Sequence, residues 1–507
     1  MKYIVGIDEG TTGCKTCIFD EKGNLISSSS REYPSYYPKP GYVEQDIIEI
    51  KEMVFESCKE AINKSQVDPK NIVGVSHSNQ GITMVLLDKE DNIVRNKTIG
   101  WQDTRHIEVL GELKNNINNE DYYNLSGMSL GTYNIAVLNW LQKYEPENWD
   151  KVNRICSHQD YFLRQLGADG FYIDEGSANF MSMLGVEDKE WNEELISVYN
   201  VKEKHLPEVV HEPGKVVGYV TKSVSEKTGL PIGCAIALGG LDTNCSSLAA
   251  GATNAGTDVL IVGTAGVSIM VVDKLIKDPN KRVTIRSNPG FGNWQLYLMT
   301  NTAASSFRWF RDSLCSLEVA ASKLMGSDPY DIMTSIASNS NPGANGVTAL
   351  TCLQGSHGRR KNENARGTFL GVSLGTSKAD IAQAILEGIT FEMKDILSMK
   401  EVIAGKIKNV RLCGGVAKSD VWCQMFADIL QKPIELTEVP ELGSLGAAMC
   451  AGIGAGIFAN TQDAVDKCVR IVKTFYPTQD KLKVYQESFE RWNKAYDTLI
   501  NLYNENK

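Results

Sequence analysis

Two short apolar runs separated by a glycine-rich turn open the chain. Residues 3–8 read YIVGID and residues 14–20 read CKTCIFD, with the polar stretch EGTTG between them. Short apolar runs bounded by turn residues predict β-strands, and a glycine-containing link of this length predicts that they pair as a hairpin. We therefore expect an N-terminal hairpin whose tip is Gly10-Thr11-Thr12-Gly13.

The same pattern returns near the middle of the chain. Residues 259–273 read VLIVGTAGVSIMVVD, which is an apolar run, the turn Gly263-Thr264-Ala265-Gly266 and a second apolar run. Gly10 and Gly263 are separated by about half of the 507 residues. This spacing predicts a chain built from two related halves, each with one glycine-tipped hairpin.

Both hairpin tips have the chemistry of a phosphate-binding turn. Glycines let the backbone approach a phosphate closely, so that N–H groups and threonine hydroxyls can face its oxygens. Asp8 stands at the entrance of the first tip. A carboxylate there would repel a phosphate unless a cation lies between them, and Mg²⁺ is the usual one. The alternative is that Asp8 and the threonines only satisfy the turn itself.

A further buried strand is followed directly by a helix that begins near an acidic residue. Residues 234–242 read CAIALGGLD and residues 243–252 read TNCSSLAAGA. Asp242 is therefore expected at the carboxyl end of a strand, where α/β sheets bind ligands. It has two interpretations, an N-cap of the helix or a general base that accepts a proton from a bound hydroxyl.

Two glycines in the second half also lie between a strand and a helix. Residues 410–420 read VRLCGGVAKSD, an apolar run followed by Gly414-Gly415 and a helix start near Ser419. Such a pair is often only a turn, but glycines here allow a flat ligand to lie against the backbone. The glycine pair therefore has two interpretations, a simple turn or a contact with a flat ligand.

The last apolar patterns are helical. Residues 442–458 read LGSLGAAMCAGIGAGIF, which is too short and too rich in glycine to span a membrane and predicts a tightly packed helix. Near the C-terminus, aromatic residues recur at helical spacing and predict an amphipathic helix whose stripe packs against the protein: Tyr485, Phe489, Trp492 and Tyr496.

Composition excludes several kinds of partner. The formal net charge of −10 gives no electrostatic footprint for nucleic acid or an anionic membrane, so any phosphate ligand has to be held locally. No run is apolar and long enough to span a bilayer and no signal peptide is evident, so we expect a cytoplasmic protein. Its 12 cysteines are then expected to be reduced, and Cys14 and Cys17 point to opposite faces of a strand.

Eight segments in register resemble one known family, the FGGY carbohydrate kinases of the actin-like and hexokinase-like ATPase superfamily. They are GIDEGTTGCKTCIFDEKGN, YYPKPGYVEQD, TIGWQDTR, ALGGLDTNCSSLAAGA, VGTAG, NARGTFLGVSLGTSKADIAQAILEGITFEM, LCGGVAKSDVWCQMFADIL and LGSLGAAMCAGIGAGIF. The resemblance implies an α/β fold of two ribonuclease-H-like domains with a cleft between them. It also implies that ATP is bound mainly by the C-terminal domain and the sugar nearer the N-terminal one.

The resemblance assigns expected roles to residues of this chain. Asp242 would be the general base, and Asp8 would organise Mg²⁺. ATP would be bound by the two hairpin tips, a nearby lysine and the double glycine, namely Thr11, Thr12, Lys15, Gly263, Thr264, Gly414 and Gly415. The sugar would be bound by Gln80, Gly81, Trp101, Asp103 and Asp242.

The expected sugar site departs from the family pattern. Glycerol kinases carry Gln-Arg-Glu-Thr and xylulose kinases carry Gln-Met-His-Gly where this chain has Gln80-Gly81-Ile82-Thr83. Gly81 and Ile82 lack the side chains with which both subfamilies read hydroxyls, so neither specificity can be transferred. Trp101 and Asp103 fit the shared Trp-x-Asp-x-Arg pattern, and we expect the indole to lie against the carbon face of the sugar.

We therefore expect an ATP- and Mg²⁺-dependent kinase for a hydroxyl of a small sugar, with a ketopentose such as xylulose as the leading substrate. A polyol such as glycerol or erythritol and a signalling sugar of the autoinducer-2 type are alternatives, and an actin-like ATPase switch is the alternative from another class. The expected domains are residues 1–250 and 255–475, followed by a C-terminal helix at 476–507. A homodimer is one of the assemblies considered.

Overall fold

The computed structural model describes residues 1–288, 290, 293–356 and 358–505, which form two compact units. Unit 1 consists of Met1–Thr253, Asp273–Gln295 and Glu441–Val469. Unit 2 consists of Asn254–Val272, Leu296–Pro440 and Arg470–Lys507. Segments from the second half of the chain thus complete the first unit.

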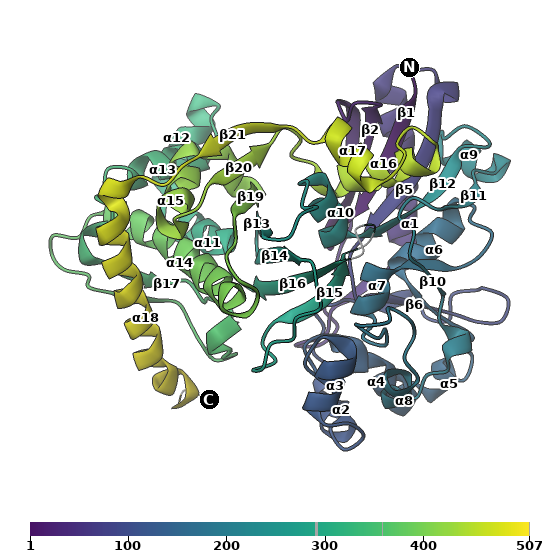
Figure 1. Cartoon of the computed structure of the whole chain (residues 1–507), viewed down its shortest axis with the longest axis horizontal. Helices are drawn as coiled ribbons and strands as arrows, with labels where there is room; N and C mark the ends of the chain where they lie inside the picture. The colour runs from purple at the N-terminus through teal and green to yellow at the C-terminus, as the bar shows by residue number, and fades with distance from the viewer. Residues whose placement is uncertain (289, 291–292, 357, 506–507) are drawn as a thin grey trace. The chain divides into compact units, whose positions relative to one another are not determined.

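Unit 1 is built on a six-stranded mixed sheet (Figure 1). In spatial order its strands are β11 (Val216–Tyr219), β12 (Ala235–Leu241), β5 (Ile72–Asn79), β1 (Tyr3–Glu9), β2 (Gly13–Asp20) and β3 (Leu25–Glu32). β1 and β2 form the antiparallel hairpin predicted from the sequence, and β5 and β12 continue the sheet in parallel. The carboxyl ends of three parallel strands therefore meet at one edge.

Shorter strands and helices complete unit 1. The two-stranded pairs are β4 (Glu44–Asp46) with β7 (Lys97–Ile99), β6 (Met84–Leu87) with β8 (Arg154–Ser157), and β9 (Tyr172–Asp174) with β10 (Glu208–Val210). A further strand is β15 (Thr284–Asn288). The helices are α1 (Ile47–Ser65), α2 (Ile107–Leu113), α3 (Asn119–Ser126), α4 (Val137–Tyr144), α5 (Pro146–Trp149), α6 (His158–Leu166), α7 (Glu175–Phe180), α8 (Glu193–Val198), α9 (Lys222–Thr228), α10 (Asp242–Ala249), α16 (Leu442–Gly454) and α17 (Thr461–Cys468).

Unit 2 repeats the same plan. Its main strands are hydrogen-bonded in the order β16 (Asn293–Thr300), β14 (Gly266–Val272), β13 (Thr257–Val262), β19 (Asn409–Cys413), β20 (Ile434–Thr437) and β21 (Ile471–Phe475). A small pair is β17 (Thr348–Leu350) with β18 (Thr368–Leu370). The helices are α11 (Ala304–Leu314), α12 (Ser316–Met325), α13 (Pro329–Ala337), α14 (Lys378–Ala404), α15 (Asp420–Leu430) and α18 (Leu482–Glu505).

The two sheets have equivalent topologies. The hairpin β13–β14 corresponds to β1–β2, and β19 and β20 run parallel to β13 as β5 and β12 run parallel to β1. Each sheet also ends on an antiparallel strand, β21 in unit 2 and β11 in unit 1. The repeated glycine-tipped pattern in the sequence therefore reflects a repeated fold.

Helix α18 confirms the amphipathic pattern near the C-terminus. Tyr485, Trp492 and Tyr496 are buried, and Trp492 lies 6.3 Å from the ring of Phe391 on α14. The aromatic stripe thus packs against the longest helix of unit 2, as a structural rather than a ligand-binding feature.

Helix α16 packs on the sheet of unit 1 through main-chain contacts. A Cβ at Gly6 of β1 would lie 1.8 Å from the carbonyl oxygen of Ser444, and one at Gly446 would lie 2.0 Å from that of Cys245 on α10. A side chain at either position would clash with backbone, so glycine is required for the helix to reach β1 and α10. The sequence predicts a tightly packed helix here, and the structure confirms it and assigns it to unit 1.

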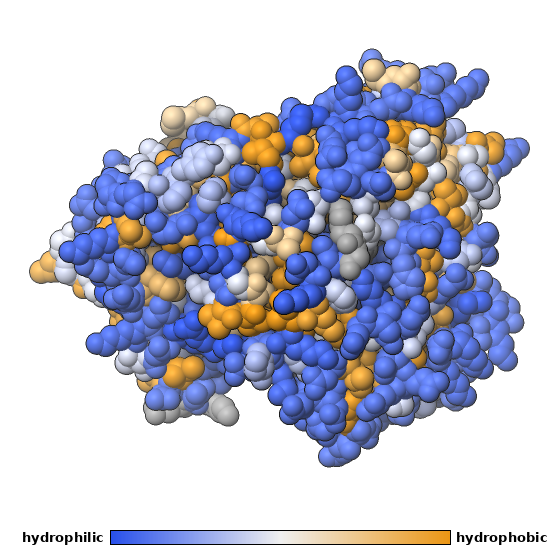
Figure 2. All heavy atoms as spheres, in the orientation of Figure 1, coloured by the Kyte–Doolittle hydropathy of each residue, from blue (hydrophilic) through white to orange (hydrophobic). Residues whose placement is uncertain are grey.

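Neither the visible surface nor the helices of the described residues indicate a membrane span. On the face shown in Figure 2, most of the surface is hydrophilic. Among the helices of the described residues, none combines the length and apolar character needed to cross a bilayer.

Replacing Gly446 tests the close packing of α16. Gly446→Ala should lower the free energy of unfolding by about 1–3 kcal/mol, because the new methyl group would overlap the α10 backbone. Gly111→Ala is the matched control, since Gly111 lies in α2 with no atom within 4 Å of a Cβ there. The control should be neutral or slightly stabilising. Urea denaturation of both variants measures the difference, and equal stabilities would show that α16 can shift freely.

Candidate active site

The carboxylate of Asp8 is held from two sides near the end of β1. Ser78 on neighbouring β5 donates a 2.8 Å hydrogen bond from Oγ to Asp8 Oδ1. The first turn of α16 comes so close that a Cβ on Gly443 would lie 2.5 Å from the carboxylate. Burial raises the pKa of Asp8 to about 6, and the charge of Glu9 adds to the shift. A nearby cation would stabilise the ionised form of such a group.

The tip of the first hairpin lies beside Asp8. A 3.0 Å hydrogen bond from the Gly10 N–H to the Gly13 carbonyl closes the turn, and the side chain of Thr12 is exposed. Lys15 pairs in register with Asp8 across the hairpin and forms a 3.5 Å ion pair with Glu441. The structure therefore brings the expected phosphate-binding residues and the expected metal-binding carboxylate together.

Asp242 is the first residue of α10 and directly follows β12. The N-cap position is occupied by Leu241, so the N-cap interpretation of Asp242 is wrong. Its Oδ1 instead accepts a 2.6 Å hydrogen bond from the N–H of Thr243.

The environment of Asp242 favours its protonated form. Burial raises the pKa of Asp242 to about 7, and the negative charge of Asp8 contributes, whereas the positive charge of Arg286 opposes the shift. The two carboxylates thus lie near enough to influence each other. A carboxyl group that ionises near neutral pH is suited to general-base work.

Glu9 is the centre of a buried network that the sequence analysis missed. Its Oε1 accepts a 2.7 Å hydrogen bond from Gln80 Nε2 and a 3.1 Å hydrogen bond from the hydroxyl of Tyr33. Its Oε2 lies 3.0 Å from Nδ1 of the fully buried His158. Gln80 Nε2 also donates to Gln45 Oε1 at 3.0 Å.

This network fixes the orientation of the Gln80 amide. Because Nε2 donates to two acceptors, Oε1 has to point elsewhere. Within the described residues, Gln80 Oε1 is buried and has no hydrogen-bond partner. An unsatisfied buried acceptor costs free energy, so this oxygen is suited to accept a hydrogen bond from a ligand hydroxyl.

Two contacts connect the network to the phosphate turn. Gln45 Nε2 donates a 2.6 Å hydrogen bond to the carbonyl of Thr11, and Trp101 Nε1 donates one of 2.9 Å to its Oγ1. The indole expected to contact the sugar is therefore anchored on the expected phosphate-binding residue.

An apolar wall lies next to Gln80. We use this name for five side chains that pack together, namely Ile82, Phe180, Leu241, Trp101 and Tyr133. A Cβ at Gly81 would lie 2.8 Å from Leu241 Cδ1 and 3.2 Å from Phe180 Cδ1, so the absent side chain of Gly81 makes room for the wall. No signal in the sequence identifies Phe180, because it joins the wall only through the fold.

Asp103 is occupied by other protein groups. Its Oδ2 accepts hydrogen bonds from the Val43 N–H at 2.7 Å and Arg105 Nη2 at 2.9 Å, and its Oδ1 accepts from Arg105 Nε at 3.0 Å. Asp103 is 1% exposed. This arrangement fixes the segment that carries Trp101 and occupies both carboxylate oxygens of Asp103.

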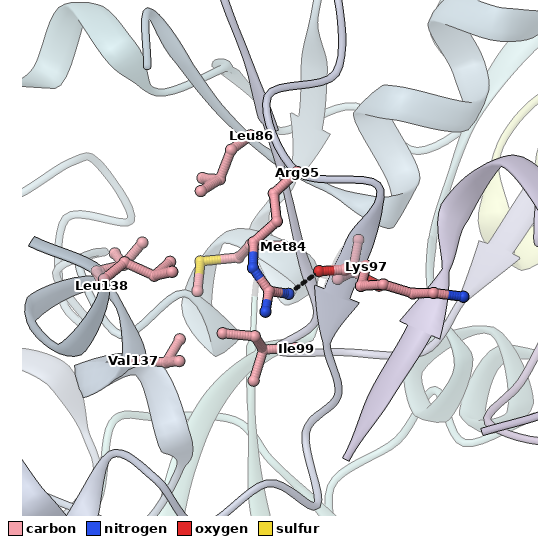
Figure 3. Close-up of a pocket in the computed structure, with 9 residues that line it drawn as sticks. Met84, Leu86, Arg95, Lys97, Ile99, Val137 and Leu138 are labelled. Atoms are coloured by element: carbon pink, nitrogen blue, oxygen red, sulfur yellow. Dashed lines mark hydrogen bonds between the residues drawn. The ribbon is translucent and has the colours of Figure 1, made fainter. Parts of the chain in front are cut away.

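A small pocket is lined by residues of β6, β7 and α4, as Figure 3 shows. Arg95 lies among its apolar residues and donates to the Lys97 carbonyl, and it also forms an ion pair of 2.7 Å with Glu44. The pocket has a volume of about 10 Å³, which leaves space for about one water molecule. It supports the fold and is too small for a sugar.

Unit 2 contains a much larger pocket of about 660 Å³ at the tip of its own hairpin. Its lining includes aromatic, cationic and small residues, namely Val262, Gly263, Thr264, Ala304, Phe307, Arg308, Asp328, Tyr330, Asp331, Thr334, Gly415, Val416, Lys418, Ser419 and Trp422. Flat aromatic side chains suit a ring, and cations suit an anion. The volume and lining fit a nucleotide.

Arg308 is a pocket residue that the sequence analysis missed. It lies on α11, is exposed, and donates a 2.7 Å hydrogen bond from Nη2 to Thr264 Oγ1. Its guanidinium is thereby held at the tip of the second hairpin.

The two glycines after β19 serve different purposes. Gly414 has a φ of +92°, and a Cβ there would lie 2.6 Å from the Val262 carbonyl oxygen. Gly415 lines the pocket, and no atom lies within 4 Å of a Cβ built on it. Gly414 therefore shapes the turn, and Gly415 keeps the pocket open.

Cys14, Cys17 and His77 are structural residues. Cys14 and Cys17 are buried, and burial raises the pKa of their thiols to about 11 and about 12. His77 is fully buried, and its ring stacks on Phe162 at 4.8 Å. These groups contribute to the core of unit 1.

Known sugar kinases match nearly the whole chain. The chain is 27% identical over 497 residues to a xylulose kinase of Staphylococcus epidermidis, which covers 98% of this chain and 96% of that protein. It is 26% identical over 506 residues to a gluconokinase of Bacillus licheniformis, which covers 99% and 97%.

The fold is also that of a solved kinase. The structure of a ligand-bound xylulose kinase from Lactobacillus acidophilus superposes with a TM-score of 0.90 at 24% identity and covers 100% of both chains. Family models describe the two halves separately: residues 3–249 match the N-terminal domain of the FGGY family of carbohydrate kinases and residues 259–455 match its C-terminal domain. The chain belongs to the FGGY family of carbohydrate kinases and is a sugar kinase.

Proposed function

We propose that the protein transfers the γ-phosphoryl group of ATP to a hydroxyl of a small ketose, such as the ketopentose xylulose, with Asp242 as general base. The observation that carries the proposal is the carboxylate of Asp242 at the end of β12, with a pKa raised to about 7 by burial and by the charge of Asp8. This is the group and the ionisation range that deprotonation of a bound hydroxyl requires.

The proposed reaction is an in-line displacement. The sugar hydroxyl oxygen forms a bond to the γ-phosphorus, the bond from that phosphorus to the β,γ-bridging oxygen breaks, and ADP leaves. Asp242 accepts the hydroxyl proton. Because phosphoryl transfer needs little covalent assistance, the main contribution of the protein is to position the groups and stabilise charge.

Each hairpin tip offers residues that suit phosphates. Thr11, Thr12 and Lys15 at the first hairpin tip, and Gly263 and Thr264 at the second, would contact phosphates. The adenosine would lie in the pocket of unit 2 beside Gly415 and Trp422.

Asp8 fits a role in holding Mg²⁺. Mg²⁺ commonly binds through one or two carboxylates together with water and substrate phosphates, and Asp8 is a partly exposed carboxylate beside a phosphate-type turn. When bound, the ion would neutralise charge on the phosphates. Asp8 itself would orient that ion at the first hairpin tip.

The substrate is expected among small ketoses. Gln80 Oε1 and Asp242 would accept hydrogen bonds from sugar hydroxyls, and Trp101 would lie against its carbon face. The relatives named xylulose kinase and gluconokinase both match nearly the whole chain, so a polyhydroxylated acceptor is supported without fixing which one.

ADP release with a panel of acceptors tests this function. With Mg·ATP, we expect turnover to require one member of a panel of pentuloses, hexuloses, tetritols, gluconate and glycerol. Asp242→Asn should lower kcat about 10²–10⁴-fold, because the proton acceptor is lost, and should leave ATP binding intact. Steady ATP hydrolysis that no acceptor stimulates would instead support an actin-like ATPase switch.

The pH dependence tests the role of Asp242 as a base. Since only the carboxylate accepts a proton, kcat/KM for the sugar should fall on acidification, with a midpoint well above the ordinary carboxyl value of 3.8 and up to about 7. Arg286→Gln should raise this midpoint, because a positive charge favours the carboxylate. Arg286→Lys keeps the charge and is the control. If the midpoint is the same in all three proteins, the charge of Arg286 does not affect the ionisation of Asp242.

Arg308 should contribute to ATP binding. Arg308→Ala should raise the KM for ATP about ten- to hundredfold, as expected for the loss of a hydrogen bond to a charged group, with a smaller effect on the KM for sugar. Arg359→Ala is the control, because Arg359 lies outside the pocket lining and pairs with Asp395 at 3.5 Å. An unchanged KM for ATP in both variants would place the phosphates away from Arg308.

A further inference from the structure

The geometry points to a substrate that presents a deoxy or methyl carbon to the apolar wall, so that this kinase prefers deoxy sugars over their fully hydroxylated counterparts. The inference rests on the proposed function and specifies its substrate class. It follows from the position, composition and backbone of the wall formed by Ile82, Phe180, Leu241, Trp101 and Tyr133.

The wall connects the proposed base, Asp242, with the proposed phosphate-binding turn that contains Thr11. Leu241 directly precedes Asp242, the proposed base. At the other end, Trp101 donates its indole N–H to Thr11 in the phosphate turn. Trp101 and Tyr133 are partly exposed, whereas the other three side chains are buried. A sugar held between Asp242 and the turn would therefore lie along this wall.

Phe180 occupies the centre of the wall. Its ring lies 4.7 Å from that of Tyr133, and the guanidinium of Arg286 lies 4.5 Å from its centroid. Arg286 in turn donates a 3.4 Å hydrogen bond to Thr243, the residue after Asp242. Phe180, the last residue of α7, is thus held by the ring of Tyr133 and by a cation anchored next to the proposed base.

The two residues that follow Gln80 bring no hydrogen-bonding side chain to the wall. Gly81 contributes no side chain, and Leu241 and Phe180 approach the position that its Cβ would take. The next residue, Ile82, contributes only an aliphatic group, and it is 7% exposed. Gly81, Ile82, Phe180 and Leu241 offer a hydroxyl neither donor nor acceptor. The polar groups of the other two members are already engaged, since the Trp101 N–H donates to Thr11 and the Tyr133 hydroxyl bonds with Thr284.

The backbone of Ile82 is held in an unfavourable conformation. Its φ is +70°, in the left-handed region that β-branched residues rarely adopt. Strain of this kind persists where the surrounding structure requires a particular side chain placement, and it concentrates at binding sites. The conformation therefore supports a specific role for the Ile82 side chain in the wall.

The wall should favour an apolar carbon of the substrate over a hydroxyl at the same position. A hydroxyl buried against the wall would lose its bonds to water without replacement, whereas a methyl or methylene group would gain apolar contact. Gln80 Oε1 and Asp242 remain available for the other hydroxyls. The site therefore selects a molecule with one polar and one apolar region.

Matched sugar pairs test this preference with the full-length protein. The pairs are 1-deoxy-D-xylulose with D-xylulose, L-fuculose with L-tagatose, and L-rhamnulose with L-fructose, each differing by one hydroxyl. We expect kcat/KM in the phosphorylation assay to be at least about tenfold higher for the deoxy member of at least one pair. Calorimetric titration of the same pairs should give the same order of affinity.

A substitution in the wall should change the preference. Ile82→Asn supplies an amide that can bind a hydroxyl, and asparagine tolerates a positive φ, so the variant is expected to fold. The deoxy preference should fall at least about tenfold in this variant. Ile82→Val keeps an apolar β-branched side chain and should retain the preference.

Each outcome decides the inference. Equal kcat/KM within each pair, or higher values for the hydroxylated members, would overturn it while leaving the kinase function intact. A deoxy preference that Ile82→Asn leaves unchanged would also overturn it, because the wall would not be its source. If no sugar is phosphorylated or bound, both the proposed function and this inference fail.

Discussion

The close approach of the α16 backbone to its neighbours is the constraint on which the site in unit 1 depends. Gly6 and Gly446 allow carbonyl oxygens to occupy the space where side chains would otherwise lie. One contact fixes β1, which carries Asp8, and the other fixes α10, which begins at Asp242. Main-chain packing is less adaptable than side-chain packing, so the separation of the two carboxylates is set by the fold itself.

Unit 1 contains carboxyl groups whose burial disfavours their ionised forms. Burial raises the pKa of Asp8, Asp174 and Asp242 to about 6, about 6 and about 7, and the charge of Asp8 adds to the shift of Asp242. A divalent cation at Asp8 would remove part of the repulsion that keeps Asp242 protonated. Metal loading and ionisation of the proposed base would therefore be coupled through electrostatics alone.

Local patterns in the sequence predict the elements that local chemistry determines. The two hairpins, the strand before Asp242 and the aromatic helix α18 follow from apolar periodicity and turn residues. The network around Glu9 and the place of Phe180 do not, because they join residues such as Glu9 and His158 that are far apart in the chain. Asp103 shows the same limit: the motif identifies the residue, and only the contacts with Arg105 and Val43 show that its oxygens are occupied.

The return of residues 441–469 to unit 1 has a consequence for synthesis of the protein. A nascent chain emerges from its N-terminus at about 5–20 residues per second, so the sheet of unit 1 is made long before the helix that covers it. Until Gly446 has left the ribosome, the apolar surface of β1 and β5 that α16 will bury stays uncovered. Unit 1 therefore cannot complete its fold before most of unit 2 has been synthesised.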